Sequence, residues 1–312
     1  MTTLLFTHDD AHLHVTPRRD DERVDRLKAV LETLADLGLD QRDAPLGTDE
    51  MIGLVHDAGY AGKIRAQIPT EGFTCLDQGL GDETFLCPTS ENAIWRAVGG
   101  AVAAVDAVLS QEAANAFVAM RPPGHHAEHA LPMGFCVFGN VAIAAKHALD
   151  VCGLSRVAVI DFDVHHGNGT QALLQDDPRA TVITSQQVPL WPGTGLASER
   201  GPHGTVVNLA LPPGTDGVYA LREYETKAFP KLRAHRPELI ILSAGFDAHQ
   251  DDPLAQLNWA PSDYAALTRR ICEEAAALCD GRVVSVLEGG YDLNGLATSA
   301  RAHVKELMKA AT

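Results

Sequence analysis

Residues 157–166 read Val-Ala-Val-Ile-Asp-Phe-Asp-Val-His-His, an apolar, β-branched run that ends in acidic and imidazole side chains. Such a run, without polar alternation, is typical of a strand that is covered on both faces in a parallel sheet. Similar runs alternate with longer helical patterns along the chain, which indicates an α/β fold. The expected strands are 117–120, 157–163, 181–184, 239–243 and 283–287.

The segments between these strands predict helices that flank the sheet on both faces. Apolar residues recur at helical spacing over 137–150, 219–234, 262–278 and 293–309, and over 24–34 and 90–109 nearer the N-terminus. No Gly/Ser linker, low-complexity tract or internal repeat interrupts the 312 residues. We therefore expect a single domain over 1–312, with a mostly parallel central sheet.

The charge balance excludes some partners. With 41 acidic against 25 basic residues the formal net charge is -16, which repels phosphate backbones and anionic membranes, although acidic surfaces are also common in soluble proteins. The sequence shows no basic and apolar leader, and no run of the roughly 18 apolar residues that a membrane span needs. The six cysteines form no Cys-x-x-Cys pair. We expect a cytoplasmic protein that binds neither nucleic acid nor membrane.

A polar motif follows each expected strand directly. These motifs are 121–126, 161–166, 186–195, 244–247 and 288–291. In open α/β sheets, sites are built at the carboxyl ends of the strands. The motifs are therefore expected to converge on one site.

Two of these motifs supply metal ligands. Asp163 and His165 lie two residues apart at a strand end, and Asp247 follows a neighbouring strand. Two carboxylates and one imidazole leave a coordination position open, as in catalytic metal sites. The set suits Zn²⁺ and tolerates Fe²⁺ or Co²⁺.

Two further motifs supply groups that move protons. His125 and His126 follow a Pro-Pro-Gly turn, and each needs a partner that fixes its tautomer, for which Asp161 and Asn168 are the candidates. Tyr291 follows a Gly-Gly turn, where its phenol could stabilise an oxyanion or simply pack. Together with a metal, these groups predict an amide hydrolase.

The sequence resembles the histone deacetylase and acetylpolyamine amidohydrolase family, within the arginase-deacetylase fold. The resemblance rests on matching stretches over most of the chain, which are 121–127, 133–136, 161–171, 192–195, 243–247 and 287–292. It implies that Asp163, His165 and Asp247 bind zinc and that Tyr291 donates to the oxyanion.

The resemblance also assigns the two histidines. His126 would be the main general base and acid, and His125 would give electrostatic support while pairing with Asp161. Asn168 stands where some branches carry Asp, and this neutral partner, which resembles the class II branch, should leave His126 less basic. A structural potassium ion is implied beside Asp161.

Substrate-binding positions follow from the same resemblance. Phe135 and Trp191 match the aromatic walls of an acyl-lysine tunnel, while Gly134 and Gly290 would let backbone approach the substrate stem. Leu254 stands where the polyamine-selective branch carries Glu, which favours acetyl-lysine over acetylpolyamines.

Other positions leave the substrate open. Glu128 or Asp251 could still recognise a polyamine ammonium. Leu86 replaces the Asp with which class I enzymes grip the substrate backbone, and Gln186-Gln187 replaces a His-containing pair.

The remaining histidines are not assigned a role in the site. His129 and His249 are expected to be exposed loop residues near the site, and His147, His203 and His303 belong to no recognisable group.

The leading interpretation is a zinc-dependent deacetylase that acts on an acetyl-lysine peptide or another small acetylated amine. The alternatives are an acetylpolyamine or other small-molecule amidohydrolase and, less favoured, a catalytically silent acyl-lysine binding module. A manganese ureohydrolase would need further Asp ligands that the motifs lack. Homo-oligomerisation is compatible with the resemblance, although no residue demonstrates it.

Overall fold

The computed structural model describes residues 2–17, 21–81 and 83–312. Within these ranges eight strands form one sheet in the order β2-β1-β5-β10-β9-β6-β7-β8, and every neighbouring pair is parallel. This confirms the expected parallel α/β architecture. The strands are β1 (Thr3–Thr7), β2 (Asp40–Asp43), β5 (Asn115–Val118), β6 (Val157–Asp161), β7 (Ala180–Gln187), β8 (Val206–Leu211), β9 (Ile240–Ala244) and β10 (Val283–Leu287).

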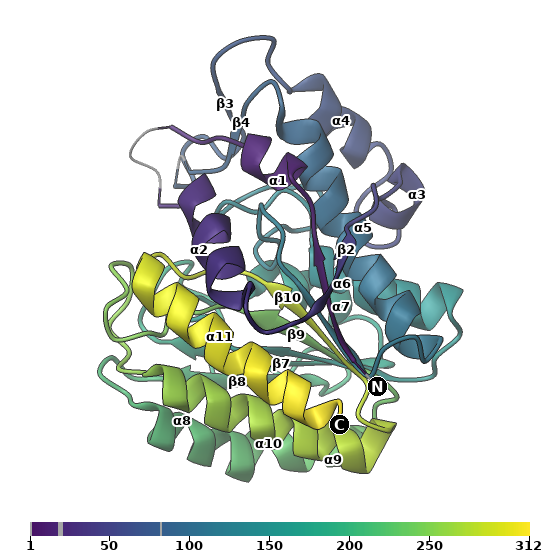
Figure 1. Cartoon of the computed structure of the whole chain (residues 1–312), viewed down its shortest axis with the longest axis vertical. Helices are drawn as coiled ribbons and strands as arrows, with labels where there is room; N and C mark the ends of the chain where they lie inside the picture. The colour runs from purple at the N-terminus through teal and green to yellow at the C-terminus, as the bar shows by residue number, and fades with distance from the viewer. Residues whose placement is uncertain (1, 18–20, 82) are drawn as a thin grey trace.

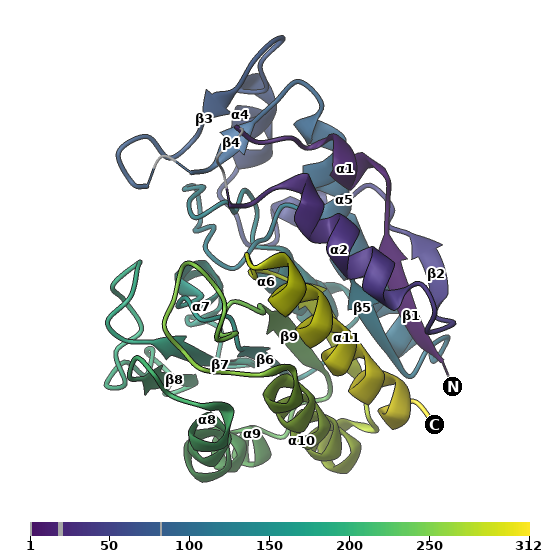
Figure 2. The ribbon, with the colours of Figure 1, turned by 60° about the vertical axis from the view of Figure 1, so that its left-hand side comes forward.

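Helices cover both faces of the sheet (Figures 1 and 2). On one face, α2 packs on α11, α11 packs on α10, and α10 contacts α8 and α9. On the other face, α5 packs on β5 and α6 packs on β6. The helices are α1 (Asp10–Leu13), α2 (Val24–Leu34), α3 (Asp49–Ile52), α4 (Tyr60–Ala66), α5 (Ser90–Leu109), α6 (Asn140–Lys146), α7 (Asn168–Leu174), α8 (Gly217–Glu223), α9 (Phe229–His235), α10 (Pro261–Cys279) and α11 (Leu293–Ala310), with π-helical turns η1 (His147–Val151) and η2 (Tyr224–Ala228).

The expected elements are present, with some differences at their ends. The five expected strands occupy the centre of the sheet, while β1, β2 and β8 come from segments for which no strand was expected. The helix expected over 137–150 begins at Asn140 and passes into η1, and the helix expected over 219–234 contains η2. Both interruptions are π-turns, which helical periodicity does not resolve.

Helix α5 is long and apolar enough to span a membrane. No segment of this kind was expected from the sequence. About 72% of its most apolar 18-residue window is buried inside the protein. It therefore serves as a core helix against β1, β5 and β10.

Outside the main sheet, β3 (Thr74–Cys75) and β4 (Phe85–Leu86) form a short antiparallel pair. Thr84, just before β4, accepts a hydrogen bond from the backbone N–H of Phe135 at 3.0 Å. This contact brings the segment that connects β3 to β4 next to the motif at 133–136.

Candidate active site

Five polar motifs meet where β5, β6, β7, β9 and β10 end, as the placement of the motifs predicts. Because these strands run parallel, the loops that follow them all emerge at the same edge of the sheet.

Asp163, His165 and Asp247 lie together at this edge, and their candidate ligand atoms are all within 4.8 Å of one another. Nδ1 of His165 lies 3.2 Å from Oδ1 of Asp163 and 3.2 Å from Oδ2 of Asp247. Backbone N–H groups aim the carboxylates, since Val164 donates to Asp247 and Gly289 to Asp163. The structure thus brings the three predicted ligands into one group.

The chemistry of this group fits a divalent cation. Both carboxylates are buried, and burial and the charge of Asp163 raise the pKa of Asp247 to about 8. Burial lowers the pKa of His165, but hydrogen bonds to Asp163 and Asp247 outweigh it and raise this pKa to about 10. The buried carboxylates therefore need a positive charge between them. A bound metal would supply that charge and leave the imidazole neutral.

Two glycines allow the carboxylates to approach so closely. A Cβ atom on Gly245 would overlap the carboxylate of Asp163, and one on Gly289 would overlap those of Asp163 and Asp247. Any larger residue at these positions would displace the candidate ligands.

His125 and His126 lie beside this group, with ring centroids 3.9 Å apart. Nδ1 of His125 lies 3.0 Å from Oδ2 of Asp161, and Nδ1 of His126 lies 2.8 Å from Oδ1 of Asn168. Each imidazole therefore meets one of the two candidate partners named from the sequence.

The supporting residues fix the tautomer of His126. The side-chain amide of Asn168 donates to Oε1 of Glu128 at 2.8 Å, so the amide oxygen is the atom that faces His126. That oxygen only accepts, and Nδ1 of His126 must therefore carry the proton. The other ring nitrogen, Nε2, is left with its lone pair as a base.

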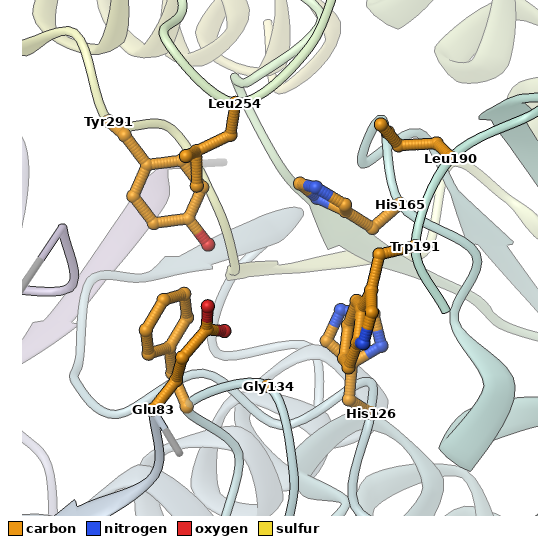
Figure 3. A pocket seen from close by; sticks show the side chains of 9 residues that line it. Glu83, His126, Gly134, His165, Leu190, Trp191, Leu254 and Tyr291 are labelled. Carbon is orange, nitrogen blue, oxygen red and sulfur yellow. The ribbon is translucent and has the colours of Figure 1, made fainter. Parts of the chain in front are cut away.

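Tyr291 lies across the cavity from His126, with its hydroxyl directed into the space between them (Figure 3). Its backbone N–H donates to Oδ2 of Asp252 at 2.8 Å, and the Arg26 guanidinium lies 4.9 Å from its ring centroid. Burial raises the pKa of Tyr291 well above its usual value, although the charge of Arg26 opposes this. The phenol is therefore a proton-bearing donor at neutral pH.

A cavity of about 160 Å³ separates these groups. Of the predicted substrate-binding residues, Gly134, Phe135, Trp191 and Leu254 line it. A Cβ on Gly134 would overlap the rings of His126 and Trp191, so glycine is required there. Phe135 has a φ of 66°, a rare conformation for a residue with a side chain, and one that often marks functional sites.

Gly290, which the resemblance also places beside the substrate stem, is not among the residues that line the cavity. Its φ of 122° turns the chain so that a Cβ would point at Phe246 and Leu296, and its carbonyl accepts from Nε of Arg26 at 2.6 Å. Gly290 thus shapes the turn before Tyr291, and its contact with a substrate stem stays a prediction.

Two lining residues, Glu83 and Leu190, were not expected from the sequence. The carboxylate of Glu83 points into the cavity (Figure 3). Burial and the charge of Asp77 raise its pKa. The resemblance directed attention to Leu86 nearby, but Leu86 is fully buried in β4.

Other sequence departures also have structural roles. Gln186 donates to the carbonyl of Gly195 at 2.5 Å, and Gln187 donates to Gln256 at 2.5 Å, so the pair holds two loops. His129 is exposed as expected, whereas His249 is buried.

The buried residue Glu288 was not identified from the sequence as one that supports the catalytic histidines. Its carboxylate accepts from the backbone N–H groups of Gly124 and His125, at 2.7 and 3.2 Å. It thereby fixes the turn that presents the two histidines.

A buried group of side chains that could hold a metal ion, facing a histidine and a tyrosine hydroxyl across a narrow cavity, is the arrangement expected of an amide-cleaving hydrolase. The chain belongs to the histone deacetylase family, since the histone deacetylase domain model matches residues 20–307.

Individual relatives agree with this assignment. The chain is 36% identical to a histone deacetylase-like amidohydrolase of Pseudomonas aeruginosa, over 85% of this chain and 70% of that one. It is also 36% identical to the human polyamine deacetylase HDAC10, over 99% of this chain but only 48% of the longer relative. The solved structure of the HDA15 HD domain matches with a TM-score of 0.90 and 29% identity, covering 99% of this chain and 89% of that one.

Proposed function

We propose that this protein is a zinc-dependent deacetylase of N-acetylated amines, with the acetyl-lysine side chain as the preferred substrate. The observation that carries the proposal is the metal-binding group Asp163, His165 and Asp247, which faces His126 and Tyr291 across the cavity. Zinc bound there would act as a Lewis acid on the acetyl carbonyl and on the attacking water.

The side chains of the protein would perform the remaining steps. Nε2 of His126, left unprotonated by the contact with Asn168, accepts a proton from the attacking water and later returns it to the leaving amine. The Tyr291 hydroxyl donates to the developing oxyanion. His125, held by Asp161, stabilises the negative charge electrostatically.

The same proposal includes a structural potassium ion beside Asp161. The backbone carbonyl of Asp161 and the hydroxyl of Ser185 both lie within hydrogen-bonding reach of the Tyr224 hydroxyl, at 3.5 and 2.8 Å. Carbonyl and hydroxyl oxygens are the ligand type that hard cations take, so this region offers suitable donors for such an ion.

The shape of the cavity supports a linear acyl-amine substrate. Phe135 and Trp191 form two aromatic walls, and the Trp191 ring centroid lies 4.7 Å from that of His126. An aliphatic stem between these rings would deliver the acetyl group to the metal-binding group. Leu254 on the wall offers no charge to a distant ammonium, which favours acetyl-lysine.

A second candidate, an acetylpolyamine amidohydrolase, is favoured by one observation. Glu83 places a carboxylate in the cavity, whereas neither acidic residue suggested by the sequence lines it: Glu128 binds Asn168, and the Asp251 side chain is 58% exposed. A cationic amine could pair with Glu83.

The test is acetate release from acetyl-lysine peptides, acetylputrescine and neutral acetamides. Protein reconstituted with zinc is compared with metal-stripped protein. We expect zinc-dependent turnover that is highest for the peptides. Faster turnover of acetylputrescine would favour the second candidate, and no turnover of any substrate by metal-loaded protein would favour a silent binding module.

The Glu83→Gln variant then distinguishes the two substrates. For acetylputrescine we expect kcat/KM to fall by roughly 2- to 5-fold, as for loss of a solvent-accessible ion pair, with no change for a neutral acetamide. Asp251→Asn is the matched control, because it removes an acidic group outside the cavity lining. Equal effects of both variants would show that Glu83 does not contact the substrate amine.

A further inference from the structure

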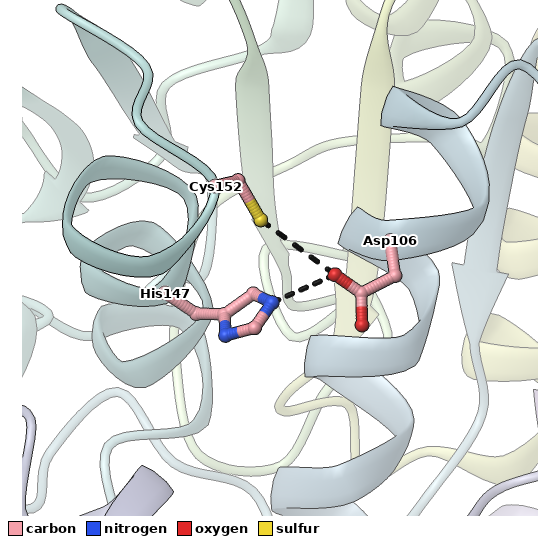
Figure 4. A group of neighbouring side chains, drawn as sticks. All are labelled: Asp106, His147 and Cys152. Carbon is pink, nitrogen blue, oxygen red and sulfur yellow. Dashed lines mark hydrogen bonds and ion pairs between the residues drawn. The ribbon is translucent and has the colours of Figure 1, made fainter.

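Three side chains that can bind a metal lie together outside the active site, namely Asp106, His147 and Cys152 (Figure 4). Oδ1 of Asp106 lies 2.7 Å from Nε2 of His147 and accepts from Sγ of Cys152 at 3.6 Å. Their candidate ligand atoms are all within 4.8 Å of one another. The expectation that His147 belongs to no group was therefore wrong.

A π-helical turn brings two of these residues together. His147 begins η1 and Cys152 follows its last residue, and the backbone N–H of Cys152 donates to the carbonyl of His147 at 3.0 Å. In an α-helix, side chains five residues apart diverge by about 140° around the axis. The wider π-turn instead directs both toward Asp106 on α5, and such turns frequently mark functional positions.

We propose that Asp106, His147 and Cys152 form a second metal site, which binds a divalent transition ion such as Zn²⁺. Carboxylate, imidazole and thiolate are the three ligand types that zinc takes in proteins. With bonds of 2.0–2.3 Å, tetrahedral zinc holds its ligand atoms roughly 3.3–3.8 Å apart.

The observed positions approach this geometry. The distance from Sγ of Cys152 to Oδ1 of Asp106 already lies in that range, at 3.6 Å. The distance from Oδ1 to Nε2 of His147 must widen by roughly half an ångström from the 2.7 Å of a hydrogen bond. Asp106 and Cys152 are exposed and can make this adjustment, and water can occupy the fourth coordination position.

The new site lies at the opposite edge of the sheet from the active site. Asp106 is near the end of α5, which leads into the start of β5, and His147 and Cys152 precede the start of β6. The catalytic groups follow the ends of these strands. A metal here would link α5 to the segment formed by α6 and η1, and would act as a structural clamp.

The thiol must lose its proton when the metal binds. The bond from Sγ to the ion replaces the S–H bond, and one proton is released to solvent.

Titration of metal-stripped protein with Co²⁺ tests the site. Thiolate-bound Co²⁺ absorbs in the near ultraviolet by charge transfer, and the group Asp163, His165 and Asp247 contains no sulfur. We expect two bound equivalents and a thiolate band. Cys152→Ser should abolish the band and weaken one equivalent by at least about 100-fold, because even the loss of an outer partner of a ligand costs 10–100-fold.

Three controls make the result specific. Cys152→Ser should keep its zinc-dependent deacetylase activity, and Asp163→Asn should keep the band while losing the other equivalent. Cys75→Ser removes a thiol that also contacts a carboxylate, and it should change neither the thiolate band nor the number of bound equivalents. A wild-type protein without the band, or a band that survives in Cys152→Ser, would overturn the second site.

Discussion

The partner of His126 provides the sharpest test of the site. His126 is buried, and burial together with the charges of His125 and His165 lowers its pKa well below the usual value. Its partner Asn168 is neutral and is oriented by Glu128. Replacing Asn168 with Asp would put a carboxylate beside the Nδ1 proton and stabilise the charged imidazole.

The size of this effect follows from the distances. Unit charges about 4 Å apart interact by about 4 kcal/mol at an effective dielectric constant of about 20, and measured shifts beside a single opposite charge are about 1 to 3 pKa units. In Asn168→Asp alone, however, the new carboxylate would lie next to Glu128, where the amide now donates at 2.8 Å. The two carboxyl groups would share a proton, so the single variant should show a smaller shift than the double variant Asn168→Asp with Glu128→Gln.

The assay is the pH profile of kcat/KM, which reports the ionisation of the free enzyme. A general base must be neutral, so raising the pKa of His126 moves the acidic limb of the profile to higher pH. We expect a shift of about 1 to 3 units in the double variant, and activity at pH 6 should fall far more than activity at pH 8. If the double variant leaves the acidic limb where it is, His126 is not the base.

Three further results are expected. Tyr291→Phe should lower kcat by about 100-fold with metal content unchanged by elemental analysis, and an unchanged rate would remove the phenol from the mechanism. Arg26→Lys, which disrupts the contact with the carbonyl of Gly290, should lower kcat roughly 10-fold with little change in KM, and a change in KM alone would contradict a role in positioning Tyr291. Burial lowers the pKa of His303 to about 3, so protonation of the unfolded state should cost about 2 kcal/mol of stability between pH 7.5 and pH 5. In urea denaturation, the free energy of unfolding of His303→Gln should change with pH by about 2 kcal/mol less than that of the unchanged protein over this range. An equal change in both proteins would refute the lowered pKa of His303.

The sequence was sufficient to place the main groups of the site. Asp163, His165 and Asp247 lie at the ends of apolar runs that are typical of buried strands, and parallel strands bring the motifs that follow them to one edge. The order of the strands was not needed for this inference. The helices over 262–278 and 293–309 could also be predicted from the sequence, because their apolar stripes keep the helical period over several turns.

The roles that sequence reasoning missed depend on contacts between distant segments. Glu83 lies in an irregular connection between two short strands, where no periodicity indicates a direction for its side chain. Glu128 acts through Asn168, which is 40 residues away in sequence. His147 and Cys152 meet only because a π-turn interrupts the helical spacing. A single sequence contains no local signal for any of these.

The pair His125 and His126 shows how such distant contacts decide chemistry. The two residues are adjacent and chemically identical, and at a ring separation of 3.9 Å a charge on one opposes a charge on the other. Burial lowers the pKa of both, but the carboxylates of Asp163 and Asp161 outweigh this for His125 and raise its pKa well above the usual value. The proton of the pair therefore resides on His125, and that charge further lowers the pKa of His126. A carboxylate in place of Asn168 would weaken this asymmetry by stabilising a charge on His126, so the neutral amide at this position keeps the imidazole of His126 uncharged and available as the base.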